Sequence, residues 1–374
     1  MTHACDGSLK IAQVAPLVES VPPRLYGGTE RVVAHLADAL VELGHDVTLF
    51  ASGDARTGAQ LVPVRPCAIR LDPAPLKSDV AAHLSMLHEV RERAQEFDVI
   101  HFHVDLLHFP LFEDVAGRTV TTLHGRLDIV DLGGVYDRWP QYPLVSISDS
   151  QRKPLPHANW VATVHHGIPQ SLFDPTPSHR GYFAFVGRIS PEKRLDRAIQ
   201  IARAAGVPLK IAAKIDVVDA TYFREAIKPL LTGSGVEFLG EVGDADKNAL
   251  LGGAKALLFP IDWPEPFGLV MIEAMACGTP VIAWNEGSVP EVIEEGVTGF
   301  VVRSIDDAVA AARDVDRLDR SRVRAAFERR FSATTMARNY VDVYWHIAQE
   351  RPQSADVRAR HHEQPGHSVG ALHA

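Results

Sequence analysis

The chain repeats one order of elements in its two halves, and this repetition constrains the fold more than any other feature. The first half runs strand, glycine turn, helix and strand, over residues 9–15, 27–28, 32–43 and 46–51. The second half restarts the same order at residue 182. Strand, turn, helix and strand form the unit of a doubly wound parallel sheet. The sequence therefore predicts two α/β, Rossmann-like domains.

A proline-rich segment, residues 174–181, separates the two halves and is the strongest linker signal in the chain. A length of 374 residues also favours two domains over one. We expect an N-terminal domain over 1–177, a C-terminal domain over 178–331, a closing helix over 332–350 and a disordered polar tail over 351–374. Ligands are expected in the cleft where both sheets present their carboxyl edges.

Composition excludes several classes of protein. The net charge of −9 argues against a general nucleic-acid binder, because no basic excess is present to neutralise phosphates. Three scattered cysteines are too few for a disulfide framework or a cysteine-rich zinc site, which fits a reducing cytoplasm. The N-terminus lacks the pattern of a secretory signal, and no apolar run approaches 18 residues. We expect a cytoplasmic protein.

The stretch 264–282 carries two carboxylates around a predicted helix start. Its two prolines disfavour a helix upstream, and the apolar spacing predicts one that follows Gly268. Glu265 then precedes the helix, and Glu273 lies within it. Hydroxyl groups need acceptors, and phosphates bind the free N–H groups of a helix start, so the stretch suits a polyhydroxylated phosphate ligand. The pattern alone also fits a surface helix with two solvated glutamates.

The turns after the first strand of each half are the next candidates. Gly27 and Gly28 allow a ligand to approach the backbone closely, although they could simply form a flexible turn that caps the helix. They do not form a G-x-G-x-x-G sequence, so a nicotinamide cofactor is poorly supported. In the second half, Arg188 and Lys193 flank the turn and could clamp a diphosphate. The alternative is two solvated surface cations.

Several histidines gather near the ends of predicted strands, namely His101, His103, His124, His165 and His166. Neutral imidazole binds zinc well, but no carboxylate or cysteine lies at a recognised metal-ligand spacing. We expect no metal site. His124 is the functional candidate, because catalytic groups of open α/β sheets collect at the carboxyl edge. For each of the others a structural role is favoured.

Together these residues resemble the retaining glycosyltransferases of family 4, which have the GT-B fold. The resemblance extends over residues 9–348. Its most specific part is the family's E-x7-E motif, which Glu265 and Glu273 match. The turn over 187–193 is similar to the family's "GR…EK" phosphate turn, and the match continues through 286–291 and 296–301.

The resemblance implies a role for each candidate residue. Arg188 and Lys193 would hold the diphosphate of a nucleotide-sugar donor, Glu273 would accept from its ribose hydroxyls, and Glu265 would face its sugar. His124 would touch the sugar near the reacting carbon. Further donor-binding positions would be the glycine loop over the phosphates, the start of the helix after Gly268 and residues near the base: Gly27, Gly28, Phe267, Gly268, Leu269, Leu239, Gly240 and Val242.

The implied reaction is retaining transfer of a hexosyl unit, favoured from a UDP- or GDP-sugar, without metal or another cofactor. The acceptor would be a small molecule, a glycan or a lipid-linked hydroxyl. The segments 58–77 and 126–142 match no family pattern, so the acceptor stays open. Pro169 stands where many members have Asp, so that aspartate's role cannot be transferred. Membrane association is not indicated, since the chain is acidic and lacks a clear basic amphipathic helix.

Two alternatives share this architecture. A nucleotide-sugar 2-epimerase would use the same donor without transferring the sugar, although the E-x7-E context is closer to family 4. A degenerate transferase could serve as a scaffold, although the presence of Arg188, Lys193, Glu265 and Glu273 argues against it.

Overall fold

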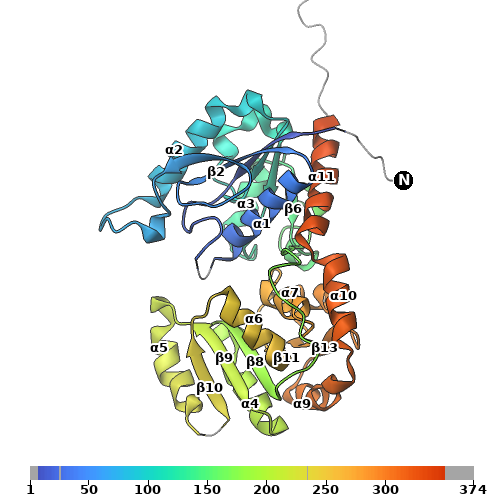
Figure 1. Ribbon diagram of the computed structural model, residues 1–374. Coiled ribbons are helices and arrows are strands. Elements are labelled where there is room, and N and C mark those ends of the chain that lie inside the picture. Colours follow the sequence, from blue (N-terminus) through green and yellow to red (C-terminus); the bar gives the residue numbers. More distant parts are fainter. Residues whose placement is uncertain (1–6, 25–26, 234, 350–374) are drawn as a thin grey trace, which may run out of the picture.

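The computed structural model describes residues 7–24, 27–233 and 235–349, which form two α/β domains, one above the other in Figure 1. The first sheet has seven parallel strands in the order β3-β2-β1-β4-β5-β6-β7. These strands are β1 (Lys10–Val14), β2 (Asp46–Ser52), β3 (Gln60–Arg65), β4 (Val99–Phe102), β5 (Thr119–Thr122), β6 (Leu144–Ser146) and β7 (Trp160–Thr163). The predicted tail over 351–374 lies outside the described residues.

The second sheet has six parallel strands in the order β10-β9-β8-β11-β12-β13. They are β8 (Tyr182–Arg188), β9 (Leu209–Lys214), β10 (Val236–Gly240), β11 (Ala254–Phe259), β12 (Val281–Trp284) and β13 (Gly299–Val302). In both sheets the strand order reverses beside the first strand, between β1 and β4 and between β8 and β11. Ligands of doubly wound folds bind at the carboxyl ends of such neighbouring strands. The predicted pair of Rossmann-like domains is confirmed.

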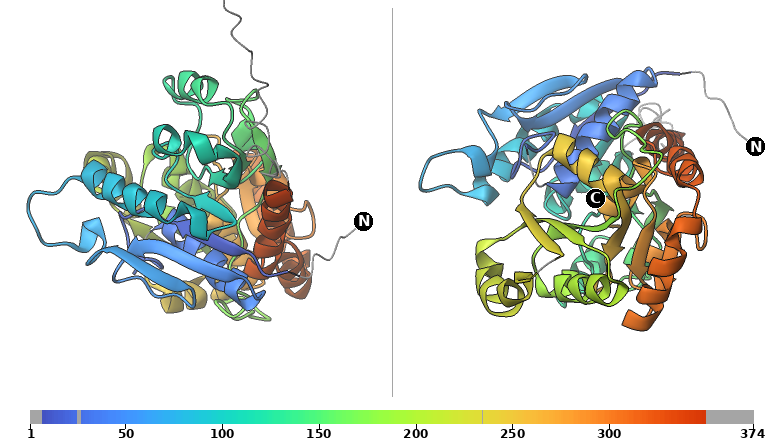
Figure 2. Two further views of the ribbon diagram at one scale, coloured as in Figure 1. Left: turned by 90° about the horizontal axis from the view of Figure 1, so that it is seen from above. Right: turned by 60° about the horizontal axis from the view of Figure 1, so that its bottom comes forward.

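Helices connect the strands and cover both faces of each sheet (Figure 2). They are α1 (Gly28–Glu42), α2 (Asp79–Glu92), α3 (Leu132–Arg138), α4 (Leu195–Ala205), α5 (Ala220–Tyr222), α6 (Asp244–Gly253), α7 (Leu269–Ala276), α8 (Val289–Val292), α9 (Ile305–Asp314), α10 (Arg320–Arg330) and α11 (Ala333–Gln349). Strand β1 shows why two layers are needed. Ala12 and Val14 pack into the core on the α2 side, and Ile11 packs on the α1 side, because strand side chains alternate between faces.

Helix α11 ties the end of the described chain to the first domain. It follows α10 on the second domain and then lies beside α1, where Tyr340 and Tyr344 are fully buried (Figure 1). At the crossing point Ile168 N–H donates to the Phe331 carbonyl at 3.0 Å, and Ala333 N–H donates to the Ile168 carbonyl at 2.8 Å. The two domains are therefore joined here by backbone contacts.

One strand was absent from the sequence interpretation. Residues 58–77 matched no pattern, yet they contain the edge strand β3. Pro63 weakened the strand signal in the sequence, and an edge position accommodates a residue that cannot donate a ladder hydrogen bond. Helix α2, which follows β3, ends at Glu92, and a short 3₁₀ turn over Ala94–Glu96 follows it. Within the described part of the chain, no helix is both long and apolar enough to span a membrane.

Candidate active site

A cavity of about 370 Å³ lies between the two domains at the carboxyl ends of their strands. The first domain contributes the loop after β1, the start of α1 and the loop after β5. The second contributes the ends of β8, β9 and β11, the loop before α7 and the first turns of α7. Of the predicted site residues, the following line this cavity: Gly27, Gly28, His124, Arg188, Lys193, Val242, Glu265, Phe267, Gly268, Leu269 and Glu273.

The two cations of the predicted phosphate clamp are both engaged by carboxylates. Arg188, at the end of β8, donates to Glu192 Oε1 at 2.5 Å. Lys193 Nζ donates to Glu265 Oε2, which also accepts from Trp263 Nε1 at 2.8 Å. An anionic ligand entering the cavity would therefore compete with carboxylates for Arg188 and Lys193.

Glu273 has a partner that the sequence interpretation missed. It lies in α7, is 4% exposed, and accepts a hydrogen bond from Lys247 Nζ at 2.8 Å. Lys247 comes from α6 and also lies 3.5 Å from Asp244 Oδ1. Asp244 in turn accepts from Arg31 of α1 at 2.8 Å, so this ion-pair network bridges the two domains. Lys247 and Arg31 both line the cavity.

The start of α7 is formed by a tightly packed glycine and faces the glycine turn of the first domain. Gly268 has φ 80°, a left-handed conformation that L side chains rarely adopt. Across the cleft, a Cβ atom at Gly28 would lie 3.9 Å from Leu269 Cδ1, so the glycine turn of the first domain faces this helix start. A Cβ atom at Gly27 would come within 2.7 Å of Pro23 Cβ. Gly27 is therefore tightly packed against Pro23, whereas Gly28 lies at ordinary van der Waals distance from the start of α7.

The loop that carries Glu265 is held by the segment that follows β12. Gly287 has φ 56°, and a Cβ atom there would come within 2.3 Å of the Glu265 backbone. Ser288 N–H donates to the Glu265 carbonyl at 3.0 Å, and Ser288 Oγ donates to the Phe267 carbonyl at 2.7 Å. These contacts explain why the motif over 286–291 accompanies the E-x7-E motif, since it supports its backbone.

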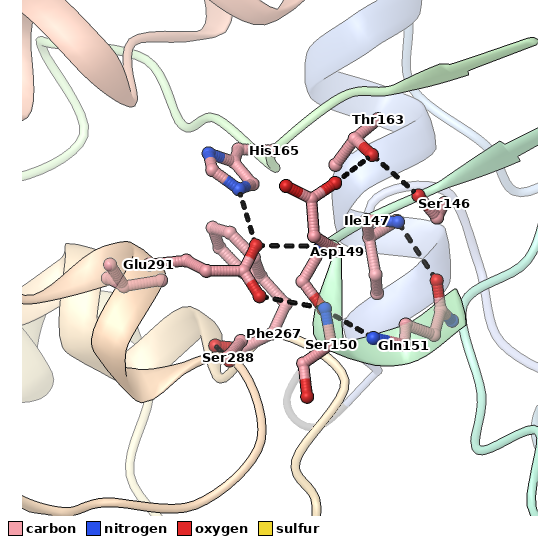
Figure 3. Close-up of polar contacts among 12 residues, drawn as sticks. Ser146, Ile147, Asp149, Ser150, Gln151, Thr163, His165, Phe267, Ser288 and Glu291 are labelled. Carbon is pink, nitrogen blue, oxygen red and sulfur yellow. Dashed lines mark hydrogen bonds and ion pairs between the residues drawn. The ribbon is translucent and has the colours of Figure 1, made fainter. Parts of the chain in front are cut away.

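Glu291, from the same motif, reaches across to the first domain (Figure 3). Its carboxylate accepts from the backbone N–H groups of Asp149 at 2.7 Å and Ser150 at 2.8 Å, and lies 3.3 Å from His165 Nε2. Burial opposes ionisation of Glu291, but these donors outweigh it and hold the pKa of its carboxyl below the usual value. Glu291 therefore links the domains beside the cavity.

His124 follows β5 and lies on the first-domain wall of the cavity. Burial lowers its pKa to about 3, so the ring is neutral at ordinary pH. His124 Nε2 lies 2.9 Å from His103 Nδ1, and the His124 ring stacks on His166 with centroids 5.2 Å apart. Burial also holds the pKa of His101, His103 and His166 well below the usual value. Four of the five histidines predicted near the strand ends, namely His101, His103, His124 and His166, are thus brought together as neutral rings.

Only part of the stretch over 239–242, which was predicted to bind the base, lines the cavity. Val242 and Glu241 line the cavity. Leu239 and Gly240 are not among its described lining residues, and the Leu239 side chain is 41% exposed. Their contact with a nucleotide base stays a prediction.

No group of three or more His, Cys, Asp or Glu side chains within 7–24, 27–233 and 235–349 is arranged to hold a metal ion. The chain does contain Asp-x-Asp sequences at 244–246 and 314–316. Asp244 is engaged by Arg31 and Lys247, and Asp316 by Lys255 at 2.9 Å. Positive charge at the cavity is supplied by the chain's own lysine and arginine side chains.

Comparison with known families identifies the family of the chain. The profile for glycosyl transferases group 1 matches residues 173–333, and the profile for glycosyltransferase family 4 matches residues 26–149. The chain is a family 4 glycosyltransferase. The two matches cover most of both domains, and the predicted family is confirmed.

Individual relatives support this assignment. This glycosyltransferase is 26% identical to a phosphatidyl-myo-inositol mannosyltransferase of Mycolicibacterium smegmatis, over 87% of this chain and 88% of the relative. It is 27% identical to a glycogen synthase of Mycobacterium tuberculosis, over 86% of this chain and 92% of the relative. The crystal structure of AviGT4, a glycosyltransferase involved in avilamycin A biosynthesis, matches with a TM-score of 0.71 and 26% identity, over 91% of this chain and 98% of AviGT4. The fold is therefore GT-B, as predicted.

Proposed function

We propose that this glycosyltransferase moves a hexosyl unit from a nucleoside diphosphate sugar to a hydroxyl acceptor, with retention of configuration and without a metal ion. The observation that carries the proposal is the interdomain cavity, where Arg188, Lys193 and Lys247 face His124 and the glycine turn. Fixed positive charge at the position of a leaving diphosphate stabilises the charge that develops as the glycosidic bond breaks.

The ion pairs that line the cavity suggest how the donor binds. The diphosphate would take Arg188 and Lys193 from their carboxylate partners and would also meet the N–H groups at the start of α7. Glu265, released from Lys193, would then accept from hydroxyls of the sugar. Glu273 would accept from the ribose hydroxyls while keeping Lys247. Each carboxylate thus holds a cation in place until a ligand arrives.

A nucleotide-sugar donor is also supported by a structural neighbour. HepE of Anabaena, solved in complex with UDP-glucose, has a TM-score of 0.66 and 19% identity to this chain. A likeness at 19% identity shows a shared fold. We take it as support for a nucleotide-sugar donor, and the base and the sugar have to be identified by experiment. Val242 and Glu241 mark the end of the cavity where we propose that the base lies.

The acceptor is proposed to bind in a second cavity of about 300 Å³ on the first domain. This cavity shares Thr29, His124 and Gly125 with the larger one, so the two meet at His124. Asp105 lies on its wall with φ 51°, an uncommon conformation for a residue other than glycine. Partial burial raises the pKa of the Asp105 carboxyl. We propose that this carboxylate accepts from a hydroxyl of the acceptor.

The reaction would then need few protein groups. The bond between the anomeric carbon and the diphosphate oxygen breaks, and the acceptor oxygen forms its bond on the same face of the sugar. The acceptor hydroxyl passes its proton to the departing phosphate oxygen. Arg188 and Lys193 stabilise the charge on that phosphate, which leaves as part of the nucleoside diphosphate.

The test begins with thermal unfolding in the presence of UDP-, GDP- and ADP-sugars, followed by product analysis for each donor that stabilises the protein. Slow release of free sugar and nucleoside diphosphate without acceptor is expected. Interconversion of sugar epimers would instead identify an epimerase, and binding without any turnover would identify a scaffold. The anomeric configuration of the product tests retention, and unchanged turnover with a chelator tests metal independence.

A further inference from the structure

We propose that a buried chain of hydrogen bonds from helix α11 determines which ring nitrogen of His124 carries the proton, with Gln13 and His103 as the positioning residues. The inference deepens the function proposed above, because it concerns the state in which His124 meets the sugar. It also predicts a property of the ring that can be measured without any donor.

The contacts form a continuous chain. His124 Nε2 lies 2.9 Å from His103 Nδ1, and His103 Nε2 lies 2.8 Å from Gln13 Oε1. Gln13 Nε2 donates to the Tyr344 hydroxyl at 2.9 Å. Tyr344 belongs to α11, whereas Gln13, His103 and His124 belong to β1 or follow β4 and β5. Gln13, His103 and Tyr344 are buried, so water does not compete for these bonds.

The amide of Gln13 sets the direction of the chain. Its nitrogen faces Tyr344, so its oxygen faces His103 and needs a proton from His103 Nε2. A neutral imidazole carries one proton, which leaves His103 Nδ1 as an acceptor. His103 Nδ1 can then only accept from His124 Nε2–H. His124, also neutral, is left with an unprotonated Nδ1.

The opposite direction of the hydrogen bonds would leave an N–H donor of His124 without an acceptor. Reversal of every bond would put the proton of His124 on Nδ1. That atom is covered and has no hydrogen-bond partner among the described residues. A covered N–H donor without an acceptor costs more free energy than an acceptor lone pair without a donor, and is correspondingly rarer. The direction set by Gln13 is therefore also the one that suits the surroundings of His124.

The consequence concerns what His124 can do to a ligand. With its proton committed to His103 and its Nδ1 covered and unprotonated, the neutral His124 ring cannot donate a hydrogen bond to a sugar hydroxyl and meets the sugar as an uncharged surface. The hydrogen-bond chain reaches α11 at Tyr344, whose hydroxyl also lies 2.7 Å from His101 Nδ1. Helix α11 enters the first domain directly after α10 of the second domain. Correct docking of α11 is therefore a condition for the correct protonation of His124.

The first experiment measures ring nitrogens directly by two-bond ¹H–¹⁵N correlation on the full chain labelled in histidine. His124→Gln and His103→Gln variants assign the two sets of signals. We expect both rings in the Nε2–H form between pH 6 and 8 without donor. A His124 ring protonated at Nδ1, or charged at pH 6, would overturn the proposal whatever the enzyme's substrate.

The second experiment compares two tyrosines of α11. Tyr344→Phe removes the acceptor of Gln13 Nε2 and frees the amide to rotate. Tyr340→Phe is the matched control, since this buried hydroxyl bonds Thr122 at 2.9 Å and is connected to Gln13 only indirectly, through Thr122, His101 and Tyr344. Both variants lose one buried hydroxyl and should show similar decreases in melting temperature.

The two variants should differ in ring state and turnover. Tyr344→Phe should populate the Nδ1–H form of His124 and lower kcat about tenfold, with the donor KM within about twofold, as for one lost hydrogen bond at the reacting group. Tyr340→Phe should leave the ring signals and kcat unchanged. Equal loss of kcat in both variants, or unchanged His124 signals in Tyr344→Phe, would contradict a positioning role. If the wild type lacks turnover, the proposed function fails while the ring spectra still test this inference.

Discussion

Replacement of Glu273 by glutamine is the sharpest test of the donor site. Glu273→Gln keeps the shape of a side chain that is 4% exposed, but one oxygen that can accept becomes an NH₂ group that cannot. A hydrogen bond to a charged group is worth about 1.5–3 kcal/mol, so the affinity for the donor should fall roughly 10- to 150-fold. Because the ribose is remote from the reacting bond, KM should rise while kcat at saturation is kept.

The fold should tolerate this change. Lys247 loses a charged partner but keeps Asp244 at 3.5 Å, and the glutamine oxygen can still accept from it at the position now 2.8 Å away. We expect a loss of about 1–2 kcal/mol in the free energy of unfolding. The matched control is Glu237→Gln, which alters an exposed ion pair with Lys210 in the same domain and should change neither quantity.

The assay is calorimetric titration of the nucleoside diphosphate that the donor screen identifies, alongside its 2′-deoxy analogue. Wild-type protein should prefer the ribonucleotide, and Glu273→Gln should lose most of that preference. An unchanged Kd with an intact fold would refute the contact between Glu273 and the ribose. A large loss of kcat at unchanged Kd would place Glu273 at the reacting sugar instead.

Three further predictions concern the other walls of the site. Lys193→Met should lower kcat about 100-fold or more with the melting temperature nearly kept, whereas Lys210→Met should leave the rate unchanged. Glu291→Gln should lower the melting temperature, because one of the N–H groups of Asp149 and Ser150 loses its acceptor. The pKa of Glu291 is lower in the folded state than in the unfolded state. The ionised carboxylate therefore stabilises the fold fully above the unfolded pKa, and this stabilisation is lost as pH falls through the folded pKa. The difference in melting temperature between wild type and Glu291→Gln should accordingly shrink below about pH 4. Asp105→Asn should raise KM for the acceptor and leave the Kd of the donor within about twofold, as binding assays with each substrate would measure.

Most of the fold could be predicted because its signals are local. Buried parallel strands appear as short apolar runs, and the helices between them carry apolar residues at helical spacing, so the order of elements identifies a doubly wound sheet. The edge strand β3 escaped because it is only partly buried and contains Pro63, so neither an apolar run nor clean alternation remained. A weak strand at a sheet edge is stabilised by pairing with a neighbouring strand. A local sequence pattern carries no information about that pairing.

The candidate site was predictable where its residues lie in turns or beside turns, because turns leave a clear local signal in the sequence. Gly27, Gly28 and Gly268 stand out as turn residues, and Arg188 and Lys193 stand out because they flank a turn after a strand. Lys247 lies inside a helix among other polar residues, where a lysine is ordinarily solvated. Its role follows only from the packing of α6 against α7, which directs its ammonium group to Glu273.

The histidine chain shows most clearly what sequence order cannot supply. His101 lies in β4 and His103 directly follows it, with one residue between them, so the pattern places them on the same face, and a structural role was expected for each. What gives His103 an influence on His124 is the direction of one amide, and that direction is set by Tyr344, which is 331 residues away from Gln13 in the sequence. A local pattern can identify the ring that meets the ligand. The protonation of that ring is a property of the assembled fold, because every bond in the chain must point the same way for each buried donor to find an acceptor.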